Sequence, residues 1–167
     1  MRKMTQQNLQ NAFAGESQAH MRYLVFSDAA AKDGKPGISR LFQAIAFAER
    51  VHATNHLRAL SGIQGTPENL DTAIGGETFE VEEMYPVYHN DAKFQNEPEA
   101  EKSTLYALEA EKIHARMYKK AKEAAAKGQD LKLGQVHICP VCGFTGENGP
   151  PDQCPVCGAA GKVFRTF

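Results

Sequence analysis

The sequence predicts an all-α four-helix bundle followed by a small metal-binding domain of short β-strands and loops. Residues 5–127 are rich in Ala, Glu, Leu and Lys, and their apolar positions follow helical spacing without strand-like alternation. All four cysteines and a Gly- and Pro-rich segment come after Gly134. We therefore place the bundle in residues 1–128, a linker in 129–135 and the small domain in 136–167.

The first two helices are bounded by short breaker segments. The first is expected from about Thr5 to Lys32, where the glycines and proline of residues 34–37 end it. The second is expected from about Ile38 to Leu60, before the glycine-containing segment 61–65.

The last two helices carry their own start signals. Thr66, Pro67 and Glu68 supply an N-cap, a first-turn proline and a first-turn acid for a third helix that reaches about residue 92. Pro86 predicts a kink inside it, because the helical pattern resumes after the proline. The fourth helix starts within residues 96–99 and ends near Gly128 as a C-cap.

Charge and hydropathy exclude several partners. The formal net charge is -1, from 19 basic and 20 acidic residues, so no global field attracts nucleic acid or an anionic membrane. The N-terminal residues lack the apolar stretch of a signal peptide, and no apolar run of about 18 residues occurs. We expect a cytoplasmic protein. In that reducing compartment, paired C-x-x-C spacing favours metal binding over disulfides.

Each predicted helix carries a glutamate near its middle, among small or apolar neighbours: Glu16, Glu49, Glu77 and Glu111. Two of these glutamates continue as Glu-x-x-His, with His52 and His114. Residues three apart share one helix face, so each carboxylate and its imidazole can reach the same point in the bundle interior. Glu80 adds a second carboxylate to that face of the third helix.

Such a cluster is too costly to bury without cations, because like charges in a bundle interior force protonation. A single Glu-x-x-His is usually a solvated helix face, but two on alternate helices, with glutamates on the others, are hard to produce by accident. This arrangement is typical of di-iron and di-manganese carboxylate bundles. The ligand types alone leave iron, manganese and zinc open.

The small domain contains two copies of Cys-Pro-Val-Cys-Gly, which supply Cys139, Cys142, Cys154 and Cys157. Each loop brings two thiolates together, and its glycine permits a tight turn that directs backbone N–H groups at sulfur. A domain of this size takes its stability from its metal. The spacing alone fits zinc and iron equally.

Together the two parts resemble rubrerythrins over nearly the whole chain. The motifs that carry the resemblance are residues 12–19, Glu49-x-x-His52, Gly76-Glu77-x-x-Glu80, Met84-Tyr85-Pro86, Glu111-x-x-His114 and the paired cysteine loops. The resemblance implies a ferritin-like di-iron domain with a rubredoxin-like tail. It also implies a non-haem di-iron peroxidase, an oxidoreductase that reduces hydrogen peroxide to water and protects against oxidative stress. An electron-donating reductase or a rubredoxin would supply electrons through the tetrathiolate iron.

The resemblance also assigns roles to individual residues. It implies two iron ions in a carboxylate-bridged site, held by Glu16, Glu49, His52, Glu77, Glu80, Glu111 and His114, with Glu49 and Glu111 bridging. One iron would exchange its bond between Glu80 and His52 with redox state. Tyr23 and Tyr85 would hydrogen-bond ligand carboxylates. We take Glu80, once released from iron, as the candidate proton donor for O–O cleavage.

The connections between helices favour a homodimer. In a ferritin-like bundle the second and third helices are parallel, so the segment that connects them must run the length of a helix. A helix of about 24 residues is about 36 Å long, whereas segment 61–65 reaches only about 18 Å when fully extended. The topology is therefore either plain up-down or a domain-swapped dimer, which we favour. The flexible linker 129–135 also permits a head-to-tail dimer, which would bring the tail of one subunit to the bundle of the other if the two metal sites of one chain lie far apart.

Two other functions remain open at this stage. The bundle could be a ferroxidase that handles iron, although the tetrathiolate tail would then have no role. Alternatively, the tail could be a zinc-ribbon docking module on a metal-stabilised bundle. We favour iron at the cysteines, because a tetrathiolate iron is a one-electron carrier that can re-reduce a di-iron centre.

Overall fold

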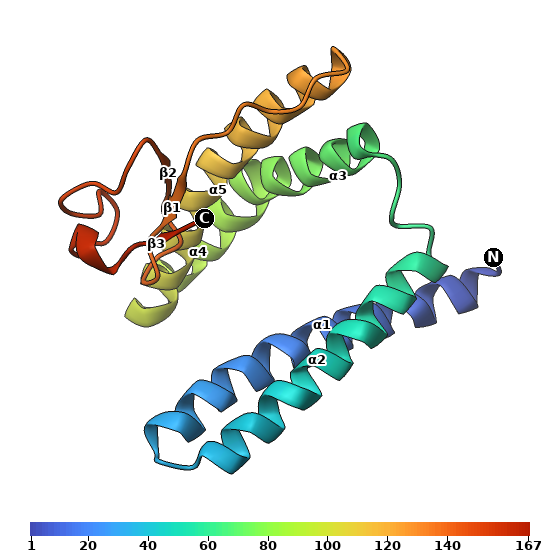
Figure 1. Cartoon of the computed structure of the whole chain (residues 1–167), viewed down its shortest axis with the longest axis horizontal. Coiled ribbons are helices and arrows are strands. Elements are labelled where there is room, and N and C mark those ends of the chain that lie inside the picture. The colour runs from blue at the N-terminus through green and yellow to red at the C-terminus, as the bar shows by residue number, and fades with distance from the viewer. The chain divides into compact units, whose positions relative to one another are not determined.

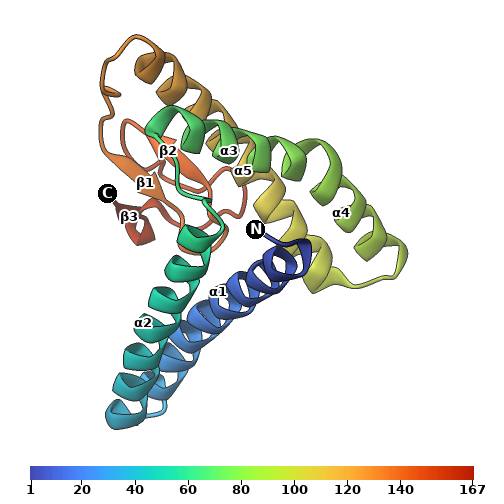
Figure 2. The ribbon, with the colours of Figure 1, turned by 90° about the vertical axis from the view of Figure 1, so that its right-hand side faces the viewer.

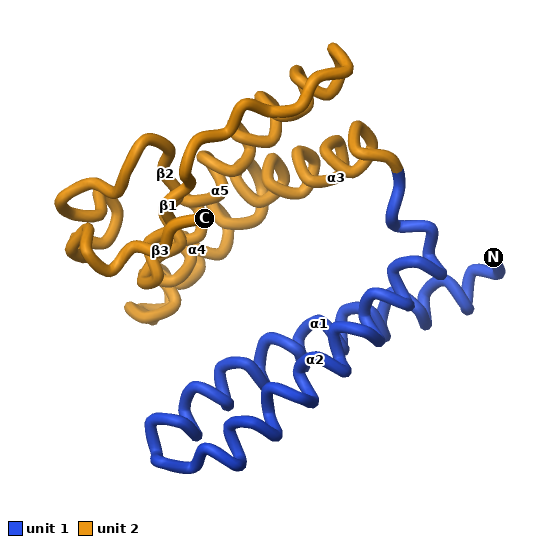
Figure 3. Tube along the Cα trace, in the orientation of Figure 1, with its two compact units in different colours: residues 1–64 blue, residues 65–167 orange.

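The computed structural model describes residues 1–167 and divides into two compact units, residues 1–64 and residues 65–167 (Figure 3). Unit 1 contains helices α1 (Lys3–Lys32) and α2 (Pro36–Ala59). Unit 2 contains α3 (Thr66–Phe79), the π-helical turn η1 (Glu80–Met84), α4 (Tyr85–Phe94), α5 (Pro98–Ala126), β1 (Val136–Ile138), β2 (Thr145–Glu147), the 3-10 turn η2 (Gly161–Val163) and β3 (Arg165–Thr166). The predicted fold class, long helices followed by a small domain of strands and loops, is confirmed.

Unit 1 is a helical hairpin in which small residues let α1 and α2 approach closely (Figure 1). Gly34 turns the chain between them at φ +69°, a conformation that side chains disfavour. Ala46 is fully buried between the helices. The buried Ser27 hydroxyl lies 2.8 Å from that of Ser39 and 3.0 Å from the Ser39 carbonyl oxygen, so the polar groups of this contact are paired.

A hairpin of two helices cannot cover all of its apolar surface. Large side chains of α1 and α2 remain exposed, including Val25, Phe26, Leu41, Ile45 and Phe47. The hairpin by itself therefore leaves large apolar side chains of both helices exposed.

In unit 2 the chain α3–η1–α4 packs along α5 (Figure 2). The predicted irregularity at Pro86 takes the form of a π-helical turn just before it. Pro86 has no N–H for the carbonyl of Glu82, and the backbone N–H of Tyr85 instead donates to the carbonyl of Glu80, five residues back. The helix continues as α4, so the segment does not end at the proline.

The cysteine-containing domain is a three-stranded antiparallel sheet with the order β2-β1-β3. Gly143 and Gly158 follow the second cysteine of each loop at φ +79° and +74°, as the predicted tight turns require. After α5 ends, the linker runs back along it (Figure 1), and the domain packs on this helix through Tyr106. Lys120 of α5 also pairs with Glu147 of β2 at 3.3 Å. No helix combines the length and the apolar character that crossing a lipid bilayer requires.

Candidate metal centres

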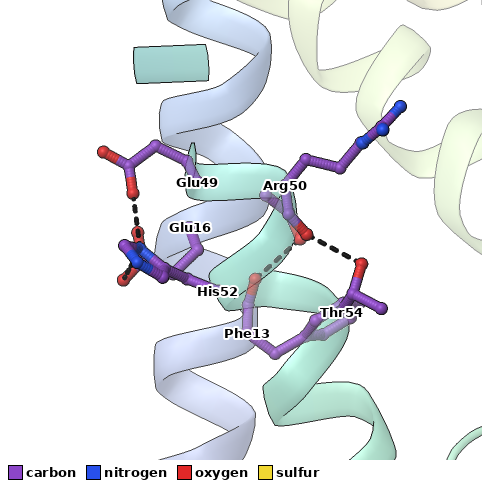
Figure 4. Close-up of polar contacts among 7 residues, drawn as sticks. Phe13, Glu16, Glu49, Arg50, His52 and Thr54 are labelled. Atoms are coloured by element: carbon purple, nitrogen blue, oxygen red, sulfur yellow. Dashed lines mark hydrogen bonds and ion pairs between the residues drawn. The ribbon is translucent and has the colours of Figure 1, made fainter. Parts of the chain in front are cut away.

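The first cluster of metal-binding groups lies in unit 1 and joins α1 to α2. Figure 4 shows Glu16, Glu49 and His52 pointing toward one another. Nδ1 of His52 lies 2.9 Å from Oε2 of Glu49 and 4.0 Å from Oε1 of Glu16. The Glu49 carboxylate is largely buried, whereas the His52 side chain is 54% exposed. This cluster provides two carboxylates and one imidazole with an open side.

The second cluster lies in unit 2 and joins α3 to α5. Nδ1 of His114 lies 2.5 Å from Oε2 of Glu111 and 3.7 Å from Oε2 of Glu77. All three side chains are largely buried. Burial, followed by the neighbouring Glu111 carboxylate, raises the pKa of Glu77 to about 7, and His114 opposes this shift.

The second cluster fits a cation better than it fits a set of isolated side chains. Oε2 of Glu77 is buried and has no hydrogen-bond partner, a state that costs about 1–3 kcal/mol or more for a charged group. Glu111 adds a second carboxylate at the same point. A divalent cation would satisfy the orphaned oxygen and remove the repulsion between the two acids.

The two clusters contain six of the seven predicted carboxylate and histidine ligands, and each unit carries one glutamate together with one Glu-x-x-His pair. The seventh, Glu80 on η1, lies outside both clusters. Burial, and then repulsion from Glu77, raises the pKa of Glu80. Glu80 is thus electrostatically coupled to the second cluster without belonging to it, and its role as a ligand stays a prediction.

The two tyrosines differ in their surroundings. Burial and the acids Glu80, Glu111 and Glu77 raise the pKa of Tyr85, which places its hydroxyl in the field of the second cluster. Tyr23 packs instead against the rings of Phe26 and Phe42, at centroid distances of 6.3 and 6.1 Å. Neither hydroxyl makes a hydrogen bond to a ligand carboxylate in the structure, so both proposed roles stay predictions.

The four cysteine sulfurs converge on one point in the small domain. Sγ of Cys139 and Cys157 are 3.6 Å apart, and those of Cys142 and Cys154 are 3.4 Å apart. A tetrahedral site with metal–sulfur bonds of about 2.3 Å has sulfur–sulfur edges of about 3.8 Å, so the spacing suits a metal ion. The cysteines are free rather than disulfide-bonded.

Backbone N–H groups donate to the sulfurs of Cys142, Cys154 and Cys157 and favour their thiolate forms. Burial raises the pKa of Cys154, but the N–H groups of Cys157 and Val156 donate to its sulfur and lower the pKa to about 7. Burial also raises the pKa of Cys142, and the backbone N–H of Phe144, which donates to that sulfur, opposes this rise without reversing it. Backbone N–H groups therefore point at sulfur in both loops, as predicted.

One contact that the sequence did not predict joins the small domain to the second cluster. Nε2 of His114 lies 2.8 Å from Oγ1 of Thr145, the first residue of β2. The sequence allowed the thiolate site and the carboxylates of one chain to lie far apart. For the cluster of unit 2 this expectation is wrong, because the linker folds back along α5 and brings the small domain into contact with His114. Thr145 belongs to no motif, so no sequence signal identified it.

Comparisons with known proteins agree with this arrangement. Residues 7–122 match the family model described as rubrerythrin, and residues 137–165 match the rubrerythrin rubredoxin-like domain. The chain is 45% identical to rubrerythrin-2 of Clostridium acetobutylicum over 156 residues, which cover 85% of each protein. It is 31% identical to nigerythrin of Nitratidesulfovibrio vulgaris, over 84% of this chain and 75% of that protein.

A solved structure resembles this chain over almost its full length. The structure of fully reduced, all-ferrous nigerythrin aligns with a TM-score of 0.57 and 28% identity, covering 98% of this chain and 86% of that one. Together with the clusters described above, these matches confirm the predicted cofactors, one iron at the four cysteines and two irons at the carboxylates and histidines.

Proposed function

The chain belongs to the rubrerythrin family of oxidoreductases, and on that premise we propose that it is a di-iron peroxidase that reduces hydrogen peroxide to water. The observation that carries the proposal is the contact between the rubredoxin-like domain and His114 of the carboxylate cluster. A peroxidase must re-reduce its carboxylate iron site in each turnover, and an adjacent thiolate iron, which carries one electron at a time, can deliver those electrons. Iron storage gives this contact no purpose.

The residues of each cluster have distinct tasks in this reaction. The carboxylates and histidines of the two clusters would together hold two ferrous ions, which would supply the two electrons that, with two protons, convert one hydrogen peroxide to two water molecules. Glu16, Glu49, Glu77 and Glu111 provide the negative charge that favours the ferric state. Glu49 and Glu111 are the proposed bridging carboxylates.

Glu80 is the proposed proton donor and redox-dependent ligand. It lies on the π-helical turn beside the second cluster, and burial makes its protonated form more accessible than that of an exposed glutamate. His52 is the proposed exchange partner of Glu80. Tyr85 would hold a ligand carboxylate from the side of α4, and Tyr23 from α1.

We further propose that the active protein is a domain-swapped homodimer. Residues 60–65 between α2 and α3 reach only about 22 Å, whereas α2, with its 24 residues, is about 36 Å long. A parallel arrangement of these helices within one chain is therefore out of reach. A second copy supplies what unit 1 lacks, namely a cover for its exposed apolar face and the complementary half of the ligand set.

The peroxidase proposal is tested by anaerobic reduction of the iron-loaded protein, followed by stoichiometric hydrogen peroxide with both iron sites monitored by visible absorption. We expect the carboxylate site to react faster with peroxide than with dioxygen, and the bleached red colour of the thiolate site to return as it donates electrons. Equal rates with the two oxidants would favour a ferroxidase. A colourless tail that binds zinc in place of iron would favour a docking module.

The swapped dimer is tested by mixing two inactive chains. Glu49→Gln damages only the ligands of unit 1, and Glu111→Gln damages only those of unit 2. In a swapped dimer, co-expression of the two variants restores one intact site per heterodimer, or about a quarter of wild-type activity with random pairing. Co-expressed chains that stay as inactive as each variant alone would refute the swap.

A further inference from the structure

We propose that Thr145 is a positioning residue for the carboxylate metal site, because its hydroxyl holds the His114 ring with Nδ1 directed at Glu77 and Glu111. The proposal deepens the proposed function but requires only that a metal binds at this cluster. It does not require that peroxide is the substrate.

The hydrogen-bond pattern around Thr145 determines the tautomer of His114. The Thr145 hydroxyl donates its single proton to the carbonyl oxygen of Gly143 at 3.1 Å. Its contact with Nε2 of His114 at 2.8 Å must then be one in which the imidazole donates. The proton therefore lies on Nε2, and Nδ1 keeps its lone pair for a metal.

The other side of the ring agrees with this assignment. Nδ1 of His114 faces the carboxylate oxygen of Glu111 at 2.5 Å, with a Glu77 oxygen 3.7 Å away. Three groups with lone pairs converge there, an arrangement that is stable when a proton or a cation lies between them. The ring is thus held from Nε2 and offers Nδ1 to the ligand cluster.

Thr145 is itself held rigidly by the thiolate domain. It is only 4% exposed and pairs with Ile138 in the sheet. The N–H of Cys139 donates to the carbonyl of Phe144, the residue before Thr145, at 2.9 Å. The threonine hydroxyl therefore connects the loop of Cys139 and Cys142 to a ligand of the second site.

The two Glu-x-x-His motifs are alike in sequence but differ in this contact. His52 also directs Nδ1 at its glutamate, but no group of the structure bonds its Nε2, and its side chain is 54% exposed. The His114 side chain is 29% exposed and bonded on both sides. Of the two imidazoles, His114 is thus the one that the chain itself holds from both ring nitrogens.

The proposal is tested by measuring cobalt(II) affinity at the carboxylate site of the full-length protein with its thiolate site loaded. Thr145→Val removes the hydroxyl with little change in shape, and loss of such a hydrogen bond to a ligating histidine lowers metal affinity about tenfold or more. Thr145→Ser keeps the hydroxyl and should bind like the wild type. Thr104→Val is the matched control, since Thr104 on α5 contacts His89, which is not in a cluster.

A second measurement reports the hydrogen bond directly. In the zinc-loaded protein, the Nε2–H proton of His114 should be protected from solvent exchange in the wild type and in Thr145→Ser, and exposed to it in Thr145→Val. Thr145→Ala carries the same expectations if valine disturbs β2. Wild-type affinity and unchanged protection in the valine or alanine variant would overturn the proposal. A wild-type protein whose cobalt affinity depends on the Thr145 hydroxyl but which reduces no peroxide would refute the proposed function alone.

Discussion

Replacing Glu77 by glutamine should stabilise the metal-free protein at alkaline pH while it weakens metal binding. Glu77 is a largely buried carboxyl with an unpaired oxygen beside Glu111. A rise of its pKa from 4.5 to about 7 on folding destabilises the ionised form by about 3 kcal/mol. The glutamine amide carries no charge and can donate to the Glu111 carboxylate, so this penalty disappears.

The sign of the pH dependence follows from proton linkage. The folded protein holds the Glu77 proton more tightly than the unfolded chain does, so its stability falls as the pH rises. The loss begins near the unfolded pKa of 4.5 and is complete above about pH 7. Glu77→Gln should therefore match the wild type near pH 4 and exceed its free energy of unfolding by about 2–3 kcal/mol at pH 8.

The assay is urea unfolding followed by far-ultraviolet circular dichroism, with zinc kept at the cysteines and the carboxylate site stripped of metal. Glu83→Gln, at an exposed position on the same π-helical turn, is the control and should leave the pH dependence unchanged. Adding ferrous or cobalt ions should stabilise the wild type more than the variant. If the variant loses stability between pH 4 and pH 8 as much as the wild type does, burial of Glu77 is not the cause.

Three further predictions test the packing and the thiolate domain. Ser27→Ala removes the paired hydroxyl between α1 and α2 and should cost about 1 kcal/mol of unfolding free energy, measured by thermal unfolding; an unchanged melting temperature would contradict this. Gly143→Ala places a side chain at φ +79° and should cost about 1 kcal/mol or more, seen as loss of the iron–thiolate absorption at a lower temperature. Removing the metal from the cysteines should abolish amide-exchange protection in β1, β2 and β3 but not in the interior of α5; protected strands without metal would refute that dependence.

Much of the fold was readable from local sequence signals. The segment 34–37 ends α1 and starts α2, and Pro67 lies in the first turn of α3, because glycine and proline restrict the backbone regardless of what surrounds them. The prediction of Thr66 as the N-cap of α3 was wrong, because Gly65 takes that position and Thr66 is the first helical residue. Helix lengths followed from apolar periodicity. The π-helical turn was foreseen only as a kink at Pro86, because the sequence shows where a hydrogen bond is lost but not how the backbone replaces it.

The members of the two clusters were also predictable, since the Glu-x-x-His spacing places each such pair on one helix face and each other helix offers a mid-helix glutamate. The clusters contain the predicted glutamates and histidines apart from Glu80, whose neighbours on η1 depend on the π-helical turn. The fold-back of residues 129–135 was not predictable, because a linker of this composition permits many paths. The placement of the thiolate domain on its own α5 followed from that path.

By itself, then, the sequence identified the side chains that gather into potential metal-binding clusters, because residue type and a spacing of three along a helix, or the repeated loop Cys-Pro-Val-Cys-Gly, are local properties. Only the tertiary structure decided how these groups are divided and connected. It placed one half of the ligand set in each unit, left Glu80 outside both clusters, and set Thr145 against His114. Contacts between residues far apart in the chain depend on packing, and no local pattern records them.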